Sequence, residues 1–198
     1  MSSLDESLAT KSEWRRALLQ ARRNVAEDAR SSEATALQEA LLRWLDGQQV
    51  RTVTAYVPVG GEPGSPGTLD ALRDAGLRVL LPVVVRDGPL EWAEFTGPDS
   101  LRPAGFGLLE PAGERLGPAA IGEADALLVP ALGVDHRGVR LGRGAGHYDR
   151  SLPMAAPDAP RIGVVRDQEF VAELPGEAHD VRMTSVLTPG RGIVALPM

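Results

Sequence analysis

The sequence from residue 50 to residue 85 reads VRTVTAYVPVGGEPGSPGTLDALRDAGLRVLLPVVV, and it decides the fold class. Residues 50–57 alternate and are rich in β-branched side chains, which predicts a strand. Glycine and proline fill residues 59–67 and predict a loop, a helix with a threonine N-cap fits 68–75, and the apolar run at 77–85 predicts a second strand. Two strands joined through a helix in this way are expected to be parallel.

The rest of the chain continues the alternation of helices and strands. Apolar residues at helical spacing predict two amphipathic helices before this unit, at residues 11–28 and 32–46. Short apolar segments after it predict strands at 90–95, 126–129, 161–165, 183–187 and 193–196. A glycine-rich loop follows the strand at 126–129, and open α/β sheets bind their ligands beyond the carboxyl ends of such strands.

Composition narrows the class of protein. The 198 residues carry a net charge of −6, which argues against a general nucleic-acid binder, and their number suits one domain over residues 1–198. The chain has no cysteine, which excludes thiol catalysis and disulfides. Its first residues lack a basic and apolar leader and no apolar run is long enough to span a membrane, so we expect a cytoplasmic protein without a membrane partner.

The stretch GVRLGRGAGHYDR, residues 138–150, carries the strongest chemical signal. Glycines at 142, 144 and 146 leave the backbone N–H groups free to face one anion, and arginines at 137, 140, 143 and 150 add charge for the same anion. A phosphate chain fits this pattern, although a plain glycine turn with solvated arginines would look the same. The stretch matches neither the P-loop nor the G-x-G-x-x-G pattern.

Two charged residues near the glycine-rich loop or at the N-terminal helix are further candidates for a phosphate site. Asp149 directly follows the glycine loop, where it would hold Mg²⁺ beside a phosphate or simply pair with Arg150 or another arginine. Lys11 is the one lysine in the chain, which is either an accident of composition or a site that needs a compact ammonium group. Trp14, on the apolar face of the same predicted helix, is expected in the core.

The sequence LLVPALGVDHRGVRLGRGAGHYDR, residues 127–150, resembles the signature of the 5-formyltetrahydrofolate cyclo-ligase family, also called methenyltetrahydrofolate synthetases. Other parts agree in the same order along the chain. These are Lys11 and Arg15 on a helix, YVPVGGEPG from Tyr56, AGLRVLLPVV from Ala75, FGLLEP from Phe106 and HDVRMTSVLTP from His179. The resemblance therefore spans nearly the whole chain.

The resemblance implies a three-layer α/β/α fold with a mostly parallel central sheet, Rossmann-like and of the NagB/RpiA/CoA-transferase-like type. It implies an ATP-dependent enzyme that uses Mg²⁺ to convert 5-formyltetrahydrofolate to 5,10-methenyltetrahydrofolate, ADP and phosphate. In this reaction the formyl oxygen attacks the γ-phosphate, an N5-iminium phosphate forms, and N10 then displaces phosphate. Such chemistry depends on positioning and charge neutralisation, which suits arginines and glycine amides. We expect a monomer whose partner is the small-molecule folate.

Carried over position by position, the resemblance assigns four groups of residues. Lys11 and Arg143 are implied as catalytic residues, and Asp149 and Asp180 as the metal ligands. The ATP contacts would be Lys11, Arg15, Arg140, Leu141, Gly142, Arg143, Gly144, Ala145, Gly146, His147 and Tyr148. The folate contacts would be Val57, Glu62, Arg143, Gly144, Ala145, Gly146 and His147. His179 would orient the loop that carries Asp180.

Two positions depart from the family pattern and keep alternatives open. The family commonly has a third loop glycine where Ala145 stands, and an aromatic residue where His147 stands. A histidine keeps a flat ring for stacking but ionises near neutral pH. One alternative is therefore a non-catalytic nucleotide- or folate-binding protein of the same fold. Another is a sugar-phosphate isomerase or sensor domain, because fold alone does not fix function.

Overall fold

The structure is a computed structural model, and it describes residues 10–177 and 180–198. His179 and the N-terminal residues that bear on the predicted location lie outside the described residues. The central sheet has seven strands in the described chain, in the order β12-β11-β9-β6-β1-β2-β3. Their bounds are β1 Thr52–Thr54, β2 Arg78–Val83, β3 Glu91–Glu94, β6 Ala126–Pro130, β9 Arg161–Val164, β11 Ser185–Thr188 and β12 Gly192–Ala195.

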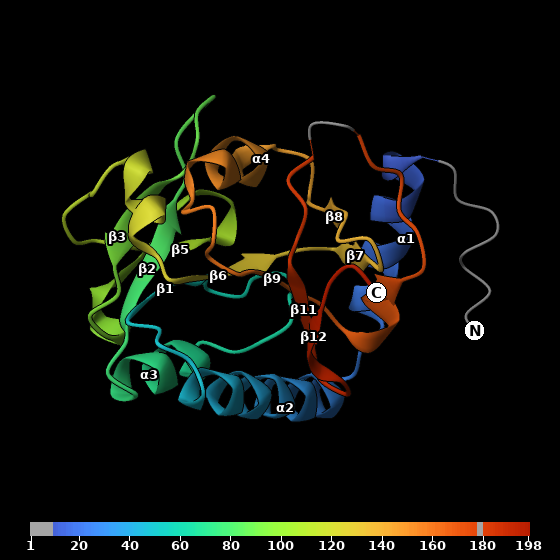
Figure 1. The fold of residues 1–198 in the computed structure, drawn as a ribbon, viewed down its shortest axis with the longest axis horizontal. Coiled ribbons are helices and arrows are strands. Elements are labelled where there is room, and N and C mark those ends of the chain that lie inside the picture. Colours follow the sequence, from blue (N-terminus) through green and yellow to red (C-terminus); the bar gives the residue numbers. More distant parts are fainter. Residues whose placement is uncertain (1–9, 178–179) are drawn as a thin grey trace.

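The sheet is mixed and mostly parallel, as predicted. Strands β1 and β2 are parallel, which confirms the strand-helix-strand unit, and β6, β9 and β11 continue in the same direction. The two edge strands, β3 and β12, run antiparallel to their neighbours. Helices α2 (Glu27–Asp46) and α3 (Gly67–Asp74) cover one side of the sheet, and α4 (His147–Ser151) lies on the other (Figure 1).

Alternate side chains of each strand enter two different cores. Val79 and Leu81 of β2 pack with Leu37 and Leu72 from the helices, in a cluster on the side of α2 and α3. Leu80 between them belongs to a second cluster on the opposite side. Because side chains of a strand alternate between the two faces of a sheet, a continuous apolar run is what a strand buried on both sides requires.

The first two helices differ in extent from the prediction. Helix α1 spans Lys11–Arg23 and ends at Asn24, so the predicted helix at 11–28 is too long and α2 begins before residue 32. A capping box between Thr10 and Glu13 begins α1. Thr68 is also not the N-cap of α3, because Pro66 holds that position. These termini depend on local backbone turns that apolar periodicity does not record.

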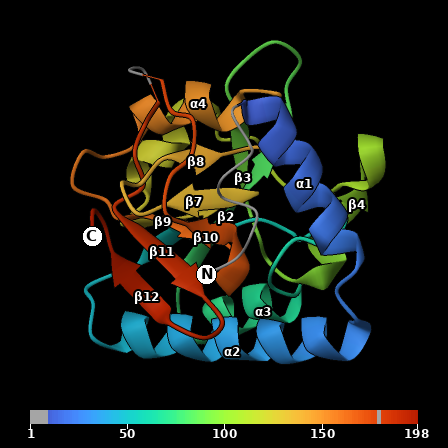
Figure 2. The ribbon, with the colours of Figure 1, turned by 90° about the vertical axis from the view of Figure 1, so that its right-hand side faces the viewer.

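A small second sheet was absent from the sequence prediction. It contains β7 (Gly133–Asp135), β8 (Arg140–Leu141) and β10 (Phe170–Val171). Helix α1 packs on this sheet rather than on the central one, and Figure 2 shows it beside β7 and β8. Trp14 is buried in this contact, as predicted. The sheet therefore fixes α1 next to the glycine-rich loop.

The remaining elements are short. Strands β4 (Leu101–Pro103) and β5 (Leu109–Pro111) form a two-stranded hairpin. The 3-10 helices are η1 Pro98–Ser100, η2 Gly105–Gly107, η3 Pro118–Glu123, η4 Leu152–Met154 and η5 Asp167–Glu169. None of the helices in the described ranges combines the length and apolar character that a membrane span needs.

Candidate active site

A cavity of about 480 Å³ opens where the parallel strands end. Tyr56 and Val57 follow β1, Val84 follows β2, and Ala131 follows β6, so three strand ends contribute to its wall. This is the edge at which open α/β sheets bind ligands. Helix α1, the loop after β1 and the glycine-rich loop close the cavity on the other sides.

The structure brings all the residues that the resemblance assigns to ATP, folate, metal or catalysis to this one cavity. The wall includes Lys11, Arg15, Val57, Glu62, Arg140, Leu141, Gly142, Arg143, Gly144, Ala145, Gly146, His147, Tyr148, Asp149 and Asp180. These residues come from α1, the end of β1 and the loop after it, β8, the glycine-rich loop, α4 and the segment before β11. Their individual roles stay predictions, but their convergence on one cavity is a structural fact.

The glycine-rich loop needs its glycines for different reasons. Gly144 and Gly146 have φ values of +105° and +72°, which other residues rarely adopt. Gly142 has no such φ, but a Cβ there would stand 2.8 Å from Nη1 of Arg140. Ala145 has no left-handed φ, so the missing third glycine creates no backbone strain.

Arg140 and Asp149 form a close ion pair at the cavity. Nη2 of Arg140 donates to Oδ1 of Asp149 at 2.6 Å, and the guanidinium lies 5.5 Å from the centre of the Tyr148 ring. Arg140 is buried on β8, whereas the Asp149 side chain is 51% exposed. In the structure, Asp149 therefore pairs with Arg140, which is the predicted alternative of a salt bridge to another arginine.

Arg143 joins the glycine-rich loop to the loop after β1. Its Nε donates to Oε1 of Glu62 at 3.1 Å, and its Nη2 donates to the carbonyl oxygen of Val59 at 3.2 Å. The other carboxylate oxygen of Glu62 accepts the N–H of Val59. The Arg143 side chain is 45% exposed, so a ligand can reach it from solvent.

Two basic residues of α1 face the same loop region. Nζ of Lys11 lies 3.2 Å from Oδ2 of Asp180 and 3.3 Å from Oε1 of Glu177. Nε of Arg15 donates to the carbonyl oxygen of Gly142 at 2.9 Å. The pairs Lys11–Asp180, Arg140–Asp149 and Arg143–Glu62 are called the cavity pairs below.

Two of the four arginines expected around one anion do not reach the cavity. Arg137 binds the buried carboxylate of Asp135 and the exposed Glu173, on the far side of the β7–β8 turn. Arg150 donates to the carbonyl oxygens of Gly88 and Ala145, which fixes the end of the glycine-rich loop. The cavity wall does not include these two arginines, so the structure gives no support for their predicted place beside the anion.

His147 also lies at this end of the loop. Its Nδ1 is 3.3 Å from the carbonyl oxygen of Gly88 and 3.2 Å from Nη2 of Arg150. The ring is therefore held at the cavity wall by the same residues that fix the loop. A stacking role against a ligand stays a prediction.

Two phenols belong to the cavity: Tyr148, which the resemblance assigns to the ATP contacts, and Tyr56, which was not predicted as a site residue. Burial raises the pKa of Tyr56 well above its usual value, and the nearby Glu62 carboxylate raises it further. Burial also raises the pKa of Tyr148, against the opposing effect of Arg140. The Tyr56 hydroxyl donates to the carbonyl oxygen of Pro63 at 2.8 Å. Both phenols are therefore neutral donors near neutral pH.

Arg22 is the functional candidate that the sequence reasoning missed. It lines the cavity from the last turn of α1, yet its side chain is only 2% exposed. The available signal was its position four residues after Leu18, which places it on the buried face of the helix. A buried arginine requires partners, and these are described below.

Asp149 and Asp180 fit the chemistry of a magnesium ion that arrives with phosphate. Mg²⁺ in nucleotide sites uses one or two carboxylates and completes its shell with phosphate oxygens and water. Both carboxylates border the same cavity as the glycine-rich loop. In the part of the chain that the structure describes, no group of three or more His, Asp or Glu residues forms a self-contained metal site.

Comparison with known proteins gives a consistent result. The model of the 5-formyltetrahydrofolate cyclo-ligase family matches residues 7–189. A 5-formyltetrahydrofolate cyclo-ligase of Mycolicibacterium smegmatis is 55% identical over 194 residues, which cover 94% of this chain and 97% of the relative. The Escherichia coli K12 protein of the same name is 29% identical over 143 residues, 71% of this chain and 79% of that protein.

Solved structures agree in fold. The NMR structure of Aquifex aeolicus 5,10-methenyltetrahydrofolate synthetase superposes with a TM-score of 0.76 and 26% identity, covering 95% of this chain and 93% of that one. The Mycoplasma pneumoniae 5,10-methenyltetrahydrofolate synthetase gives a TM-score of 0.73 at 20% identity, covering 90% and 98%. At that identity the second likeness concerns the fold alone.

Proposed function

The chain belongs to the 5-formyltetrahydrofolate cyclo-ligase family and is an enzyme of that family, and from this premise we propose how its cavity works. The proposed reaction is the ATP- and Mg²⁺-dependent cyclisation of 5-formyltetrahydrofolate to 5,10-methenyltetrahydrofolate, with release of ADP and phosphate. The observation that carries the proposal is the convergence of the glycine-rich loop, four cationic side chains and Glu62 on one cavity.

The glycine-rich loop and the cations around it suit the triphosphate. Lys11, Arg15, Arg140 and Arg143 all border the cavity beside Gly142–Gly146. In the structure, the cavity pairs neutralise three of these cations. Phosphate oxygens offer the same cations a stronger negative charge, so nucleotide binding exchanges carboxylate partners for phosphate partners.

The exchange frees carboxylates for the metal. When phosphates take over Arg140 and Lys11, Asp149 and Asp180 become ligands that would hold Mg²⁺. The bound ion would supply charge neutralisation on the phosphate oxygens. Asp149 is more than half exposed, which leaves room for the water molecules that complete a magnesium shell.

Glu62 suits the pterin end of the folate. A pterin ring presents an amino group and a neighbouring ring N–H, and a carboxylate accepts such a pair of donors. Glu62 lies beside Val57 and Tyr56 at the end of β1, where the wall is largely buried. Once Arg143 turns to the phosphates, Oε1 of Glu62 is available to the ring.

The reaction then proceeds by positioning and charge neutralisation. The formyl oxygen attacks the γ-phosphorus and ADP leaves, which gives an N5-iminium phosphate. N10 attacks the activated carbon and loses its proton, and the carbon–oxygen bond breaks to release phosphate. Arg143 and Lys11 stabilise the charge that builds on the transferred phosphoryl group, a role that fixed cationic donors perform efficiently.

A spectrophotometric assay tests this function. Purified protein is mixed with 5-formyltetrahydrofolate, ATP and Mg²⁺, and each component is omitted in turn while the methenyl absorbance is followed. The proposal predicts product only when all three are present. Binding of ATP without any product would contradict it and favour the non-catalytic alternative.

Isotope transfer tests the proposed order of bonds. If the formyl oxygen attacks phosphorus, substrate carrying ¹⁸O in the formyl group delivers the label to the released phosphate. Mass spectrometry of the phosphate measures this directly. Unlabelled phosphate during normal turnover would contradict the N5-iminium phosphate.

A further inference from the structure

Arg22 carries a buried hydrogen-bond donor for which the described residues offer no acceptor. Its Nε and Nη2 donate to the two carboxylate oxygens of Glu169 at 2.6 and 2.8 Å, and Nη2 also donates to the carbonyl oxygen of Ala131 at 2.6 Å. Nη1 is buried and has no hydrogen-bond partner among the described residues. Buried guanidinium N–H groups are normally paired, so this nitrogen calls for an acceptor.

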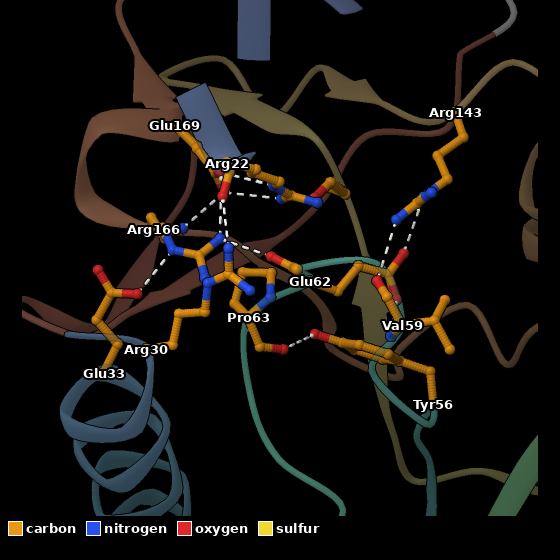
Figure 3. A network of polar contacts seen from close by, with 12 residues as sticks. Arg22, Arg30, Glu33, Tyr56, Val59, Glu62, Pro63, Arg143, Arg166 and Glu169 are labelled. Carbon is orange, nitrogen blue, oxygen red and sulfur yellow. Dashed lines mark hydrogen bonds and ion pairs between the residues drawn. The ribbon is translucent and has the colours of Figure 1, made fainter. Parts of the chain in front are cut away.

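The rest of the Arg22 side chain is rigidly held. Glu169 also accepts the backbone N–H of Arg166 at 2.9 Å, and Nε of Arg166 donates to Glu33 at 2.7 Å. Arg22, Glu33, Arg166 and Glu169 are called the buried cluster below, and Figure 3 shows them joined by a chain of contacts. Since Nε and Nη2 are fixed, Nη1 is fixed as well.

The buried cluster also anchors the loop that carries Glu62. Nη1 of Arg166 donates to the carbonyl oxygen of Gly61 at 2.9 Å. Figure 3 shows Glu62 between the buried cluster and Arg143. Arg22, Tyr56 and Glu62 line the same cavity. One rigid unit therefore sets the positions of a buried donor, Arg22, and a partly buried acceptor, Glu62.

A fixed donor and a carboxylate that line the same cavity match the edge of a heterocycle in which a C=O group is next to N–H groups. The pterin ring has this edge: the 2-amino group and the N3–H are donors, and the 4-oxo oxygen is an acceptor. We propose that Arg22 is a second recognition residue for the folate, whose Nη1 donates to the 4-oxo oxygen while Glu62 accepts from the ring N–H groups. This inference rests on the proposed function and names a further residue for it.

Phosphate has other cations in this cavity, which leaves Arg22 to a neutral acceptor. Within the buried cluster two guanidinium groups face two carboxylates, and Arg30, whose Nη2 donates to the carbonyl oxygen of Arg22 at 3.2 Å, adds one positive charge beside them. Lys11, Arg15, Arg140 and Arg143 are available to phosphate at the same cavity. The Arg22 side chain is only 2% exposed, so an acceptor must approach Nη1 from inside the cavity. This approach follows the step in which Glu62 releases Arg143 and binds the pterin ring.

The first test separates folate binding from ATP binding. Arg22→Met is compared with Arg23→Met, which changes the exposed neighbouring arginine outside the cavity wall. The expected result for Arg22→Met is a KM for 5-formyltetrahydrofolate raised by about tenfold to a hundredfold, the usual loss for a charged hydrogen bond, with an unchanged KM for ATP. An unchanged folate KM would overturn the proposal.

A double variant guards against a purely structural effect. Arg22→Met leaves Glu169 with less compensating charge in the interior, whereas Arg22→Met with Glu169→Gln removes both charges together. If the lost donor is the cause, the double variant keeps the raised folate KM while its melting temperature recovers. If the double variant regains both the wild-type folate KM and the wild-type melting temperature, the proposal is overturned, because Arg22 then has only a structural role.

A matched ligand identifies the atom that Arg22 contacts. In a 4-amino-4-deoxy form of 5-formyltetrahydrofolate, a donor replaces the 4-oxo acceptor. The wild-type protein is expected to prefer the 4-oxo form, and Arg22→Met to reduce that preference by about tenfold in the ratio of dissociation constants. An unchanged ratio would overturn the assignment. Wild-type protein that forms no methenyl product would instead overturn the proposed function.

Discussion

The buried cluster and the cavity pairs use the same kinds of side chain for opposite purposes. Arg22, Arg166 and Glu169 are each 2% exposed, and their contacts join α1, the chain after β9 and the loop that carries Glu62. In two cavity pairs, by contrast, one partner is exposed: Asp149 is 51% exposed beside Arg140 at 6%, and Arg143 is 45% exposed beside Glu62 at 11%. A pair with one partner in solvent exchanges that partner more readily than a pair buried on both sides, where breaking the contact leaves an uncompensated charge.

The difference indicates which ion pairs stay and which break when ligands bind. The buried cluster must stay intact when ligands arrive, because it fixes the positions of Arg22 and the Glu62 loop. The cavity pairs must break, because their cations and carboxylates are the groups that phosphate and Mg²⁺ would use. Substitutions in the buried cluster should therefore lower stability most, and substitutions in the cavity pairs should lower activity most.

The largest effect is expected in the buried cluster. Glu169→Ala leaves Arg22 and Arg166 without their shared carboxylate and should lower the free energy of unfolding by about 3–5 kcal/mol. Urea denaturation measures this loss. Glu173→Ala, which removes an exposed partner of Arg137, is the control and should cost less than about 1 kcal/mol. An equal loss of unfolding free energy in the two variants would contradict the distinction between buried and exposed ion pairs.

Asp149→Asn should give the reverse pattern. Loss of one carboxylate at the phosphate end is expected to lower kcat/KM by about a hundredfold or more, as removal of a single electrostatic group in an active site does. The free energy of unfolding should change by less than about 1 kcal/mol, because the Asp149 side chain is half exposed and asparagine keeps an oxygen that can accept from Arg140. Near wild-type turnover would refute a role of Asp149 with the metal.

Gly146→Ala tests the shape of the glycine-rich loop. A Cβ at φ +72° is strained and would lie 2.8 Å from Nη1 of Arg150, so we expect about 1–2 kcal/mol of destabilisation and weaker ATP binding. Ala145→Gly is the control, because Ala145 lacks a left-handed φ and requires no glycine. Calorimetric titration with ATP and thermal unfolding compare the two variants. Equal behaviour would show that loop conformation does not govern binding.

Lys11→Arg is expected to have the smallest effect. The charge is kept, but a planar guanidinium replaces a compact ammonium that lies between Asp180 and Glu177. A KM for ATP raised by about threefold to tenfold at unchanged stability is the predicted outcome. Unchanged steady-state kinetics would show that the lysine at position 11 is an accident of composition.

Much of the central sheet was predictable because its strands are buried on both faces. The apolar run at residues 77–85 contains β2, and the positions of β6 and β9 follow from equally simple patterns. The break between α1 and α2 and the β7–β8 hairpin were missed. They depend on Asn24 and on the buried carboxylate of Asp135, which accepts the N–H groups of the turn.

The candidate site was predictable in its residues but not in their pairing. The resemblance named residues that the structure gathers at one cavity, yet sequence order could not show that Arg137 and Arg150 bind elsewhere. Nor could it show that Arg22 is buried with one nitrogen unpaired among residues 10–177 and 180–198, because its partner Glu169 lies 147 residues away in the chain. Contacts between distant segments carry this information, and local patterns do not.

The central claim is that nucleotide binding exchanges the cavity pairs and leaves the buried cluster intact. The most direct test is a ¹H–¹⁵N NMR spectrum of the arginine Nε–H groups, recorded with and without MgATP and assigned by substitution. We predict that the signals of Arg15 and Arg143, whose Nε atoms donate to Gly142 and Glu62, shift on binding. Those of Arg22 and Arg166, bound to Glu169 and Glu33, should stay in place. A fixed Arg143 signal, or a shifted Arg22 signal with MgATP alone, would contradict the account.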